Sequence, residues 1–295
     1  GTRDFLNESA KENFGLDRPD MLRSAGAQAG LYGNSAKEAI YPTYFTDADD
    51  APLDLNILSQ LDQLHYHGVA SVQSAIDQLG YDASDSILEV GAGWGGPSRF
   101  IAAQSGARVT ALELQDDFST VGAHLTERCG LSTLVAHHRG DFHQVDFGGA
   151  QFDHVVSWLA LYHIPDRPTY SAKIRDVLVP GGTLFIEDLM QGTAYAKADK
   201  NELKRELFAN SLVSESDYIS GLEALGFEII SADNMTADWT AFTAQRLEMF
   251  HANQDTFTAI HGEAFFEEKG HFYTKIVEYF TASAIGGIRL AARRV

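Results

Sequence analysis

A glycine-rich turn at residues 89–96, with the sequence Glu-Val-Gly-Ala-Gly-Trp-Gly-Gly, is the first segment whose residue types suggest chemistry. Because glycine has no Cβ, the backbone around Gly91 and Gly93, with Ala92 between them, can turn sharply and approach a ligand closely. A helix that begins after such a turn offers free N–H groups to the same ligand. Gly91, Gly93 and Gly96 also satisfy G-x-G-x-x-G, the motif of dinucleotide sites. The turn therefore predicts a nucleotide cofactor without identifying its class.

Two acidic residues follow predicted strands at positions that suit nucleotide recognition. Glu113 ends the strand after the turn, where a carboxylate can hold the hydroxyl groups of a ribose. Asp141 follows the next strand and can accept a hydrogen bond from an adenine amino group, with Phe142 beside the ring. Because Glu113 suits a nicotinamide dinucleotide equally well, an NAD-dependent oxidoreductase remains an alternative.

An alternation of strands and helices must bring these residues together. Short apolar or alternating runs predict strands at residues 86–90, 108–114, 133–138, 152–158, 183–187, 227–232 and 286–293. Apolar residues at helical spacing predict helices at residues 55–79, 97–105, 119–129, 170–178 and 214–225. The repeated order of strand, helix and strand indicates an α/β fold, which binds ligands at the carboxyl ends of its parallel strands.

We expect the chain to have three parts. Residues 1–82 form a helical N-terminal segment, and residues 83–237 together with 284–295 form the cofactor-binding core. Residues 238–283 form an insertion rich in aromatic and aliphatic side chains, which favours two helices. Because an insertion this apolar must pack on something, we expect it and the N-terminal segment to cap the ends of the strands.

The series of motifs over residues 87–189 resembles the class I S-adenosylmethionine-dependent methyltransferases. The resemblance implies a Rossmann-like, seven-stranded mixed sheet whose last strand is antiparallel and pairs beside the fifth. It implies that residues 91–93 wrap the methionyl part of the cofactor, with Glu89 near its amino group. Glu113 and Asp141 then hold the ribose and the adenine, and S-adenosylhomocysteine is the product. The remaining residues of the implied cofactor site are Leu114, Phe142 and Ser157.

Within that family, the chain most resembles small-molecule enzymes that act on sarcosine, dimethylglycine or phosphoethanolamine. These enzymes have a histidine at the position of His163, which implies a base for an acceptor that must lose a proton. A tyrosine from the N-terminal segment often partners this histidine, and Tyr44 and Tyr66 are the candidates here. The aromatic residues expected around the acceptor are Trp158, Tyr162 and Trp239.

One position departs from that subgroup and widens the choice of acceptor. The fourth strand commonly ends Ser-x-Asp there, and the acid helps to hold a cationic or amino acceptor, but this chain has Leu159. Burying an ammonium group without a carboxylate is costly, and cation–π contacts compensate only in part. The expected acceptor is therefore either an amine or a thioether or hydroxy acid on a sulfonium-osmolyte route of the dimethylsulfoniopropionate type.

The charge of the chain limits its partners. It has 22 basic and 41 acidic side chains and a formal net charge of −19 at pH 7, so neither nucleic acid nor an anionic membrane is an expected partner. Such acidity also fits a salt-adapted source, in which a compatible solute is a natural product. We expect a cytoplasmic monomer or homodimer that acts on a small molecule.

No metal site is expected. The chain has a single cysteine, Cys129, and the adjacent His137 and His138 point to opposite faces of a predicted strand. A catalytically silent module that only binds the cofactor is a further alternative. The presence of both Glu113 and Asp141 argues against it.

Overall fold

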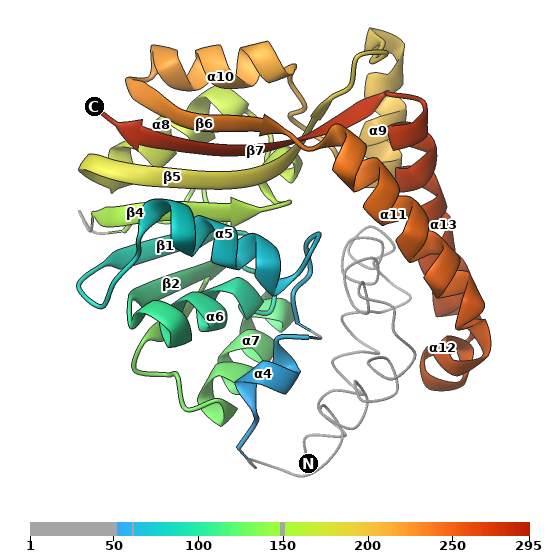
Figure 1. The fold of residues 1–295 in the computed structure, drawn as a ribbon, viewed down its shortest axis with the longest axis horizontal. Coiled ribbons are helices and arrows are strands. Elements are labelled where there is room, and N and C mark those ends of the chain that lie inside the picture. The colour runs from blue at the N-terminus through green and yellow to red at the C-terminus, as the bar shows by residue number, and fades with distance from the viewer. Residues whose placement is uncertain (1–51, 61, 148–150) are drawn as a thin grey trace.

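The computed structural model describes residues 52–60, 62–147 and 151–295, which form a seven-stranded mixed sheet. The strand order is β3-β2-β1-β4-β5-β7-β6. The strands are β1 (Ser86–Val90), β2 (Arg108–Glu113), β3 (Val135–Arg139), β4 (Phe152–Trp158), β5 (Leu178–Gln191), β6 (Phe227–Asn234) and β7 (Ile285–Arg294). β7 runs antiparallel to both of its neighbours, β5 and β6. The expected Rossmann-like sheet, with its antiparallel last strand beside the fifth, is confirmed (Figure 1).

Helices cover both faces of the sheet, and each face has its own hydrophobic core. The helices before and around the sheet are α4 (Leu55–Leu58), α5 (Val69–Leu79), α6 (Gly96–Ser105), α7 (Asp116–Arg128), α8 (Arg167–Val177) and α10 (Glu215–Ala224). Leu88 and Val90 of β1 belong to a core that also contains residues of α8 and α10. Ile87 belongs to a second core with residues of α5 and α6, because successive side chains of a strand point to opposite faces. With both faces covered, a ligand reaches the parallel strands at their ends.

The helix predicted at residues 55–79 is wrong, because the chain breaks it into α4 and α5. The connection between them, residues 59–68, ends with positive φ angles of 61° at His67 and 55° at Gly68. Five of the described residues in this connection are still buried, namely Ser59, Asp62, Gln63, His65 and Tyr66, and Tyr66 is only 4% exposed. The regular spacing of apolar residues reports this burial, and it cannot distinguish a helix from a packed irregular segment.

The insertion forms three helices, whereas the sequence predicts two. They are α11 (Thr236–Ala252), α12 (Gln254–His261) and α13 (Glu263–Thr281). α11 and α13 lie side by side beyond the end of the sheet at which β4 and β6 finish (Figure 1). Trp239 of α11 packs on Gly287 of β7, where a Cβ would overlap the indole ring. An additional helix that was not predicted, α9 (Lys200–Leu207), contacts α13.

That the insertion caps the ends of the strands stays a prediction. Within the described part of the chain, no helix combines the length and the apolar character that a membrane crossing requires.

Candidate active site

A pocket of about 380 Å³ lies where β1, β2 and β4 end. This edge is where open α/β sheets bind ligands. The expected cofactor residues that line the pocket are Glu89, Gly91, Ala92, Gly93, Glu113, Leu114, Asp141 and Phe142. Of the expected acceptor residues, Trp158 and His163 also line it. The fold therefore gathers at one site residues that are far apart in the sequence.

The glycine turn is fixed by hydrogen bonds to β2. The backbone nitrogens of Gly91 and Ala92 both donate to the carbonyl oxygen of Leu112, each at 2.9 Å. Gly91 has a φ of 75°, and a Cβ at this position would overlap the Cβ of Ala160. A larger residue would therefore need both an unfavourable backbone and a shift of its neighbour. The turn presents bare backbone to the pocket, as close approach of a ligand requires.

Glu113 ties the turn to the end of β2. Its Oε2 accepts a hydrogen bond from the backbone nitrogen of Gly93 at 2.8 Å, and its Oε1 accepts one from that of Gln115 at 2.9 Å. These bonds orient a carboxylate that is only 7% exposed. Each carboxylate oxygen has two lone pairs. In this orientation, Glu113 can also accept hydrogen bonds from the hydroxyl groups of a ribose.

Glu89 is buried beside the start of α6. Its carboxyl group accepts a hydrogen bond from the hydroxyl group of Ser98. Burial raises the pKa of Glu89 to about 8, because the charged form is poorly solvated there. A cationic ligand group would favour the carboxylate and lower this pKa again. Glu89 is thus suited to a ligand ammonium group, in agreement with its expected place near the methionyl amino group.

Asp141 and Phe142 form the wall after β3. The Oδ1 of Asp141 accepts a hydrogen bond from the backbone nitrogen of His143 at 2.9 Å, which orients the carboxylate in the pocket wall. Phe142 is 4% exposed, and its ring centroid lies 6.4 Å from that of Phe147. One side of the adenine site would therefore be a hydrogen-bond acceptor and the other an apolar ring.

His163 is held in one tautomer by a backbone carbonyl. It ends the 3₁₀ turn η1 (Leu161–His163), and its Nδ1 lies 3.2 Å from the carbonyl oxygen of Phe208. Because a carbonyl only accepts, Nδ1 carries the proton and Nε2 has the lone pair. Nε2 is buried and has no hydrogen-bond partner among the described residues. Burial lowers the pKa of His163 to about 4, so the ring is a neutral base at neutral pH.

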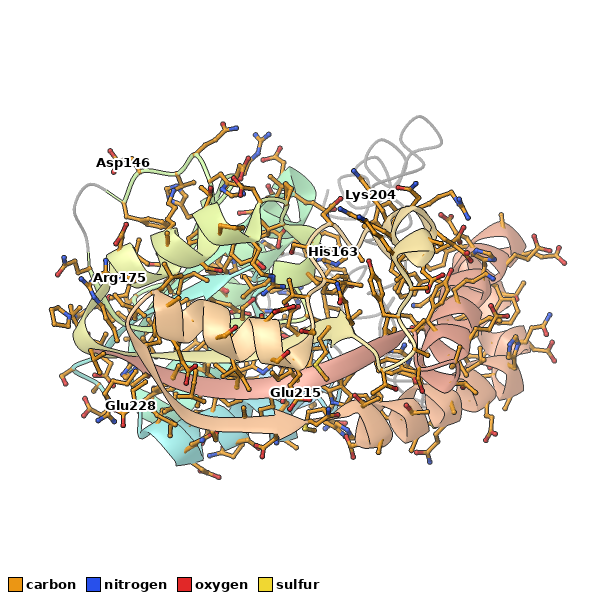
Figure 2. All side chains as sticks on the ribbon, turned by 90° about the horizontal axis from the view of Figure 1, so that it is seen from above. Asp146, His163, Arg175, Lys204, Glu215 and Glu228 are labelled. Carbon is orange, nitrogen blue, oxygen red and sulfur yellow. The ribbon has the colours of Figure 1, made fainter. Side chains whose placement is uncertain are left out.

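Two neighbours further restrict His163. The ring centroid of Tyr162 lies 3.8 Å from that of His163, and the side-chain amide of Asn210 donates to the His163 carbonyl oxygen at 2.7 Å. Figure 2 shows His163 at the end of the sheet nearest the helices α11 and α13. His163 therefore borders the pocket on the side of the insertion.

Four expected residues do not line this pocket. Tyr66 and Trp239 pack against each other edge to face, with ring centroids 5.0 Å apart, on the side of the insertion. Tyr162 is 5% exposed, and its ring packs against that of His163. Ser157 is fully buried and donates a hydrogen bond to the backbone of β1 at 2.8 Å. Tyr44 lies outside the described residues.

The connection between α4 and α5 supplies pocket residues that sequence reasoning missed. Asp62, Leu64 and His65 line the pocket. Asp62 forms a buried ion pair of 2.8 Å with Arg99 of α6, and burial lowers the pKa of His65 to about 3. No motif marks these residues, and the only signal in the sequence was the presence of polar residues within a regular apolar pattern.

The histidines of β3 do not form a metal site. The Nε2 of His137 hydrogen-bonds with the hydroxyl group of Thr126 at 2.8 Å, and His138 is exposed. Across the residues that the structure describes, no group of three or more His, Cys, Asp or Glu side chains could hold a metal ion.

Comparisons with known proteins indicate the family and the fold of the chain. The model of the family described as mycolic acid cyclopropane synthetase matches residues 59–288. The glycine/sarcosine/dimethylglycine N-methyltransferase of Actinopolyspora halophila is 25% identical over 295 residues, covering 94% of this chain and 52% of the relative. A sterol 24-C-methyltransferase of Eremothecium gossypii is 35% identical over 118 residues, covering 40% of this chain and 32% of that protein. The chain thus spans about half the length of the first of these curated relatives and a third of the second.

Two solved structures share the fold. A protein from Galdieria sulphuraria, described as a sarcosine dimethylglycine methyltransferase, has a TM-score of 0.71 at 16% identity, covering 88% of this chain and 98% of that chain. The phosphoethanolamine N-methyltransferase 2 of Haemonchus contortus, in complex with S-adenosyl-L-methionine, has a TM-score of 0.71 at 18% identity. That match covers 100% of this chain and 60% of that chain. At these identities, the likeness supports the fold alone.

Proposed function

The chain belongs to the mycolic acid cyclopropane synthetase family of class I S-adenosylmethionine-dependent methyltransferases, and on that premise we propose that it methylates a small polar metabolite. The observation that carries the proposal is the pocket that Glu113 and Asp141 share with His163. Two acids suited to a nucleoside border the same space as a neutral base. This combination, together with the family match, favours methyl transfer over the NAD-dependent alternative.

The pocket residues fit the cofactor, and different residues serve cofactor binding and proton removal. S-adenosylmethionine supplies a methyl group on a sulfonium centre. Glu89 and the glycine turn bind the methionyl part, and Glu113 and Asp141 bind the ribose and the adenine. The Nε2 of His163 takes the proton that an amine or hydroxyl acceptor must lose. Orientation of the acceptor and exclusion of water by the surrounding side chains supply the rest of the acceleration.

Three observations support a small polar acceptor. The relative that aligns with 94% of this chain carries the name of an enzyme for glycine, sarcosine and dimethylglycine. A net charge of −19 disfavours polyanionic substrates such as nucleic acid. The pocket is bordered by Leu159, in place of the acid that holds a cationic acceptor, so a thioether or hydroxy acid stands beside an amine as the substrate. We place the enzyme in the cytoplasm, in the synthesis of a compatible solute.

The direct test is to incubate the protein with methyl-labelled S-adenosylmethionine and a panel of acceptors. The panel contains sarcosine, dimethylglycine, phosphoethanolamine, thioether carboxylates and hydroxy acids, and mass spectrometry identifies the labelled product. We expect label in one chemical class, with an equal amount of S-adenosylhomocysteine. Tight S-adenosylhomocysteine binding without any labelled product would instead favour a silent cofactor-binding module. Binding of NAD(H) without binding of S-adenosylhomocysteine would overturn the proposal.

A further inference from the structure

The insertion contains a buried arginine that has no hydrogen-bond partner in the described part of the chain. Arg246 of α11 is 5% exposed. None of its three guanidinium nitrogens has a hydrogen-bond partner among the described residues. Its surroundings are aromatic: the guanidinium carbon lies 4.3 Å from the ring centroid of Tyr273, 5.2 Å from that of Tyr66 and 5.9 Å from that of Phe242.

The surroundings of Arg246 do not compensate fully for removing its charge from water. A guanidinium group has five N–H donors and keeps its charge at all accessible pH values. Removing such a group from water is expensive unless an anion and hydrogen bonds replace the water. The faces of three aromatic rings compensate only part of that cost. The nearest charged residue toward the start of the same helix, Asp238, is paired with His67 at 2.6 Å. A missing anion is the simplest complement to Arg246.

The position of Arg246 connects it to the candidate active site. Tyr66, which it contacts, belongs to the same hydrophobic cluster as Leu159 and Tyr162. Leu159 lines the pocket, and the ring of Tyr162 lies tilted against that of His163, with centroids 3.8 Å apart. Arg246 does not itself line the pocket, and its link to the pocket runs through Tyr66 on the side of the insertion. An acceptor bound there could hold its anionic end at α11 and direct its other end toward His163 and the cofactor.

We propose that Arg246 binds the carboxylate of the methyl acceptor, an inference that rests on the proposed function. A planar guanidinium matches a carboxylate with two parallel N–H···O bonds, and one positive charge balances one negative charge. The Nζ of Lys269 in α13 lies 5.6 Å from the centroid of the same Tyr273 ring. Recognition through the anionic end also explains how an acceptor is held where Leu159 replaces an acid. The enzyme binds the acceptor's carboxylate, and the nucleophilic atom needs no charge for binding.

Matched acceptors test this assignment. Each pair has a carboxylate member and an alcohol member: sarcosine with N-methylethanolamine, and 3-(methylthio)propanoate with 3-(methylthio)propanol. For the wild-type protein, we expect the carboxylate member to be the better substrate. Arg246→Met should raise KM for the carboxylate about tenfold to hundredfold, the effect of losing a charge-assisted hydrogen-bonded pair. KM for the alcohol should not change. KM of Arg246→Lys for the carboxylate should lie between those of the wild type and Arg246→Met, because lysine keeps the charge and lacks the planar guanidinium.

Two controls separate a binding role from a structural one. Arg246→Met removes an unpaired buried charge, so the melting temperature of the ligand-free protein should stay the same or rise. Lys275→Met changes a cation of α13 that is already paired with Glu278 at 2.8 Å, and it should leave both KM values unchanged. A sharp loss of ligand-free stability in Arg246→Met, or an equal rise of KM for acid and alcohol, would overturn the assignment.

Binding is also measured without turnover, so that this inference and the proposed function can fail separately. Acetate titrated into the S-adenosylhomocysteine complex should bind the wild-type protein and not Arg246→Met. If acetate binds in this way and no acceptor is methylated, the anion site stands and the proposed function fails. If acceptors are methylated and acetate binds both proteins equally, the anion site fails. Inorganic phosphate binding more tightly than acetate would overturn the carboxylate in favour of a phosphate.

Discussion

His163 is the residue whose removal distinguishes the two acceptor classes. A positioned base contributes about 10²-fold to 10⁴-fold when the acceptor must lose a proton. His163→Ala should therefore lower kcat by this amount on an amine or hydroxyl acceptor and far less on a thioether, which has no proton to lose. The check is kcat on one acceptor of each kind, with S-adenosylhomocysteine affinity as the control for an intact cofactor site. Undiminished kcat on an amine would remove His163 from the mechanism.

The pH dependence of kcat tests the same residue independently. Burial lowers the pKa of His163 from its usual 6.5 to about 4, so the base stays deprotonated well below the pH at which an exposed histidine gains its proton. The acid limb of kcat should therefore lie below 6.5 rather than at it. The same shift makes the folded protein less stable in acid. His163 is protonated below about pH 6.5 in the unfolded chain but only below about pH 4 in the folded one, so stability falls as the pH drops through this range. An acid limb centred near 6.5 would contradict the buried neutral ring.

Glu89 gives cofactor binding its own pH dependence. With a pKa raised to about 8, its carboxyl group is protonated in the free protein at neutral pH, and a bound ammonium group makes it release that proton. Affinity for S-adenosylhomocysteine should therefore rise as the pH increases toward 8. Calorimetry in buffers of different ionisation enthalpy should detect the released proton. Glu89→Gln should bind more weakly and abolish the proton release, whereas release unchanged in this variant would assign the proton to another group.

At the scale of elements, the buried pair of Asp62 and Arg99 holds the connection of residues 59–68 against α6. Both side chains are almost completely buried, and removing one partner leaves the other charge without compensation. Asp62→Ala should therefore lower the free energy of unfolding by about 3–5 kcal/mol. The double variant Asp62→Ala/Arg99→Met should recover much of the lost free energy of unfolding, because no unpaired charge stays buried. Denaturant titration measures both, and a double variant no more stable than the single one would show that the charge is not the cause.

A matched surface pair shows what burial contributes. Glu278→Ala breaks the pair with Lys275 on α13, where the glutamate side chain is 53% exposed. An exposed pair contributes at most about 1 kcal/mol, so this variant should unfold almost as the wild-type protein does.

The elements differ in how far the sequence predicts them. The strand predicted at residues 86–90 coincides with β1, because an apolar run that ends in glycines has few alternative structures. The same local signals predicted Glu113 and Asp141, which follow from their places after strands. The helix at residues 55–79 was wrong because burial of its irregular middle depends on contacts with distant parts of the fold. For the same reason no pattern singled out Arg246, whose role depends on which rings surround it.

At the scale of the whole molecule, the fold separates two tasks. The sheet, with a hydrophobic core on each face, positions the residues that we assign to the cofactor. The side that we propose for the acceptor combines the connection after α4, the turn at His163 and the insertion, which come from distant parts of the chain. The sequence predicted the residues that we assign to the cofactor, together with Trp158 and His163, whereas Asp62, His65 and Arg246 are recognised only when these segments meet.

The net charge of −19 predicts how the stability of the molecule responds to salt. Unscreened like charges repel one another most strongly in the compact state, and the distance over which they act falls from about 30 Å at 0.01 M salt to about 8 Å at 0.15 M. The melting temperature should therefore rise with added NaCl, steeply at first and then little, as screening becomes complete. A gain of about 1 kcal/mol raises the melting temperature of a domain of about 150–250 residues by about 2–4 °C, and a longer chain such as this one by less. NaCl and KCl at equal ionic strength should act alike, because screening depends on ionic strength and not on the cation. A melting temperature that is insensitive to salt would mean that the acidic side chains are spaced or paired so that they do not repel, and the salt-adapted interpretation would then lose its physical basis.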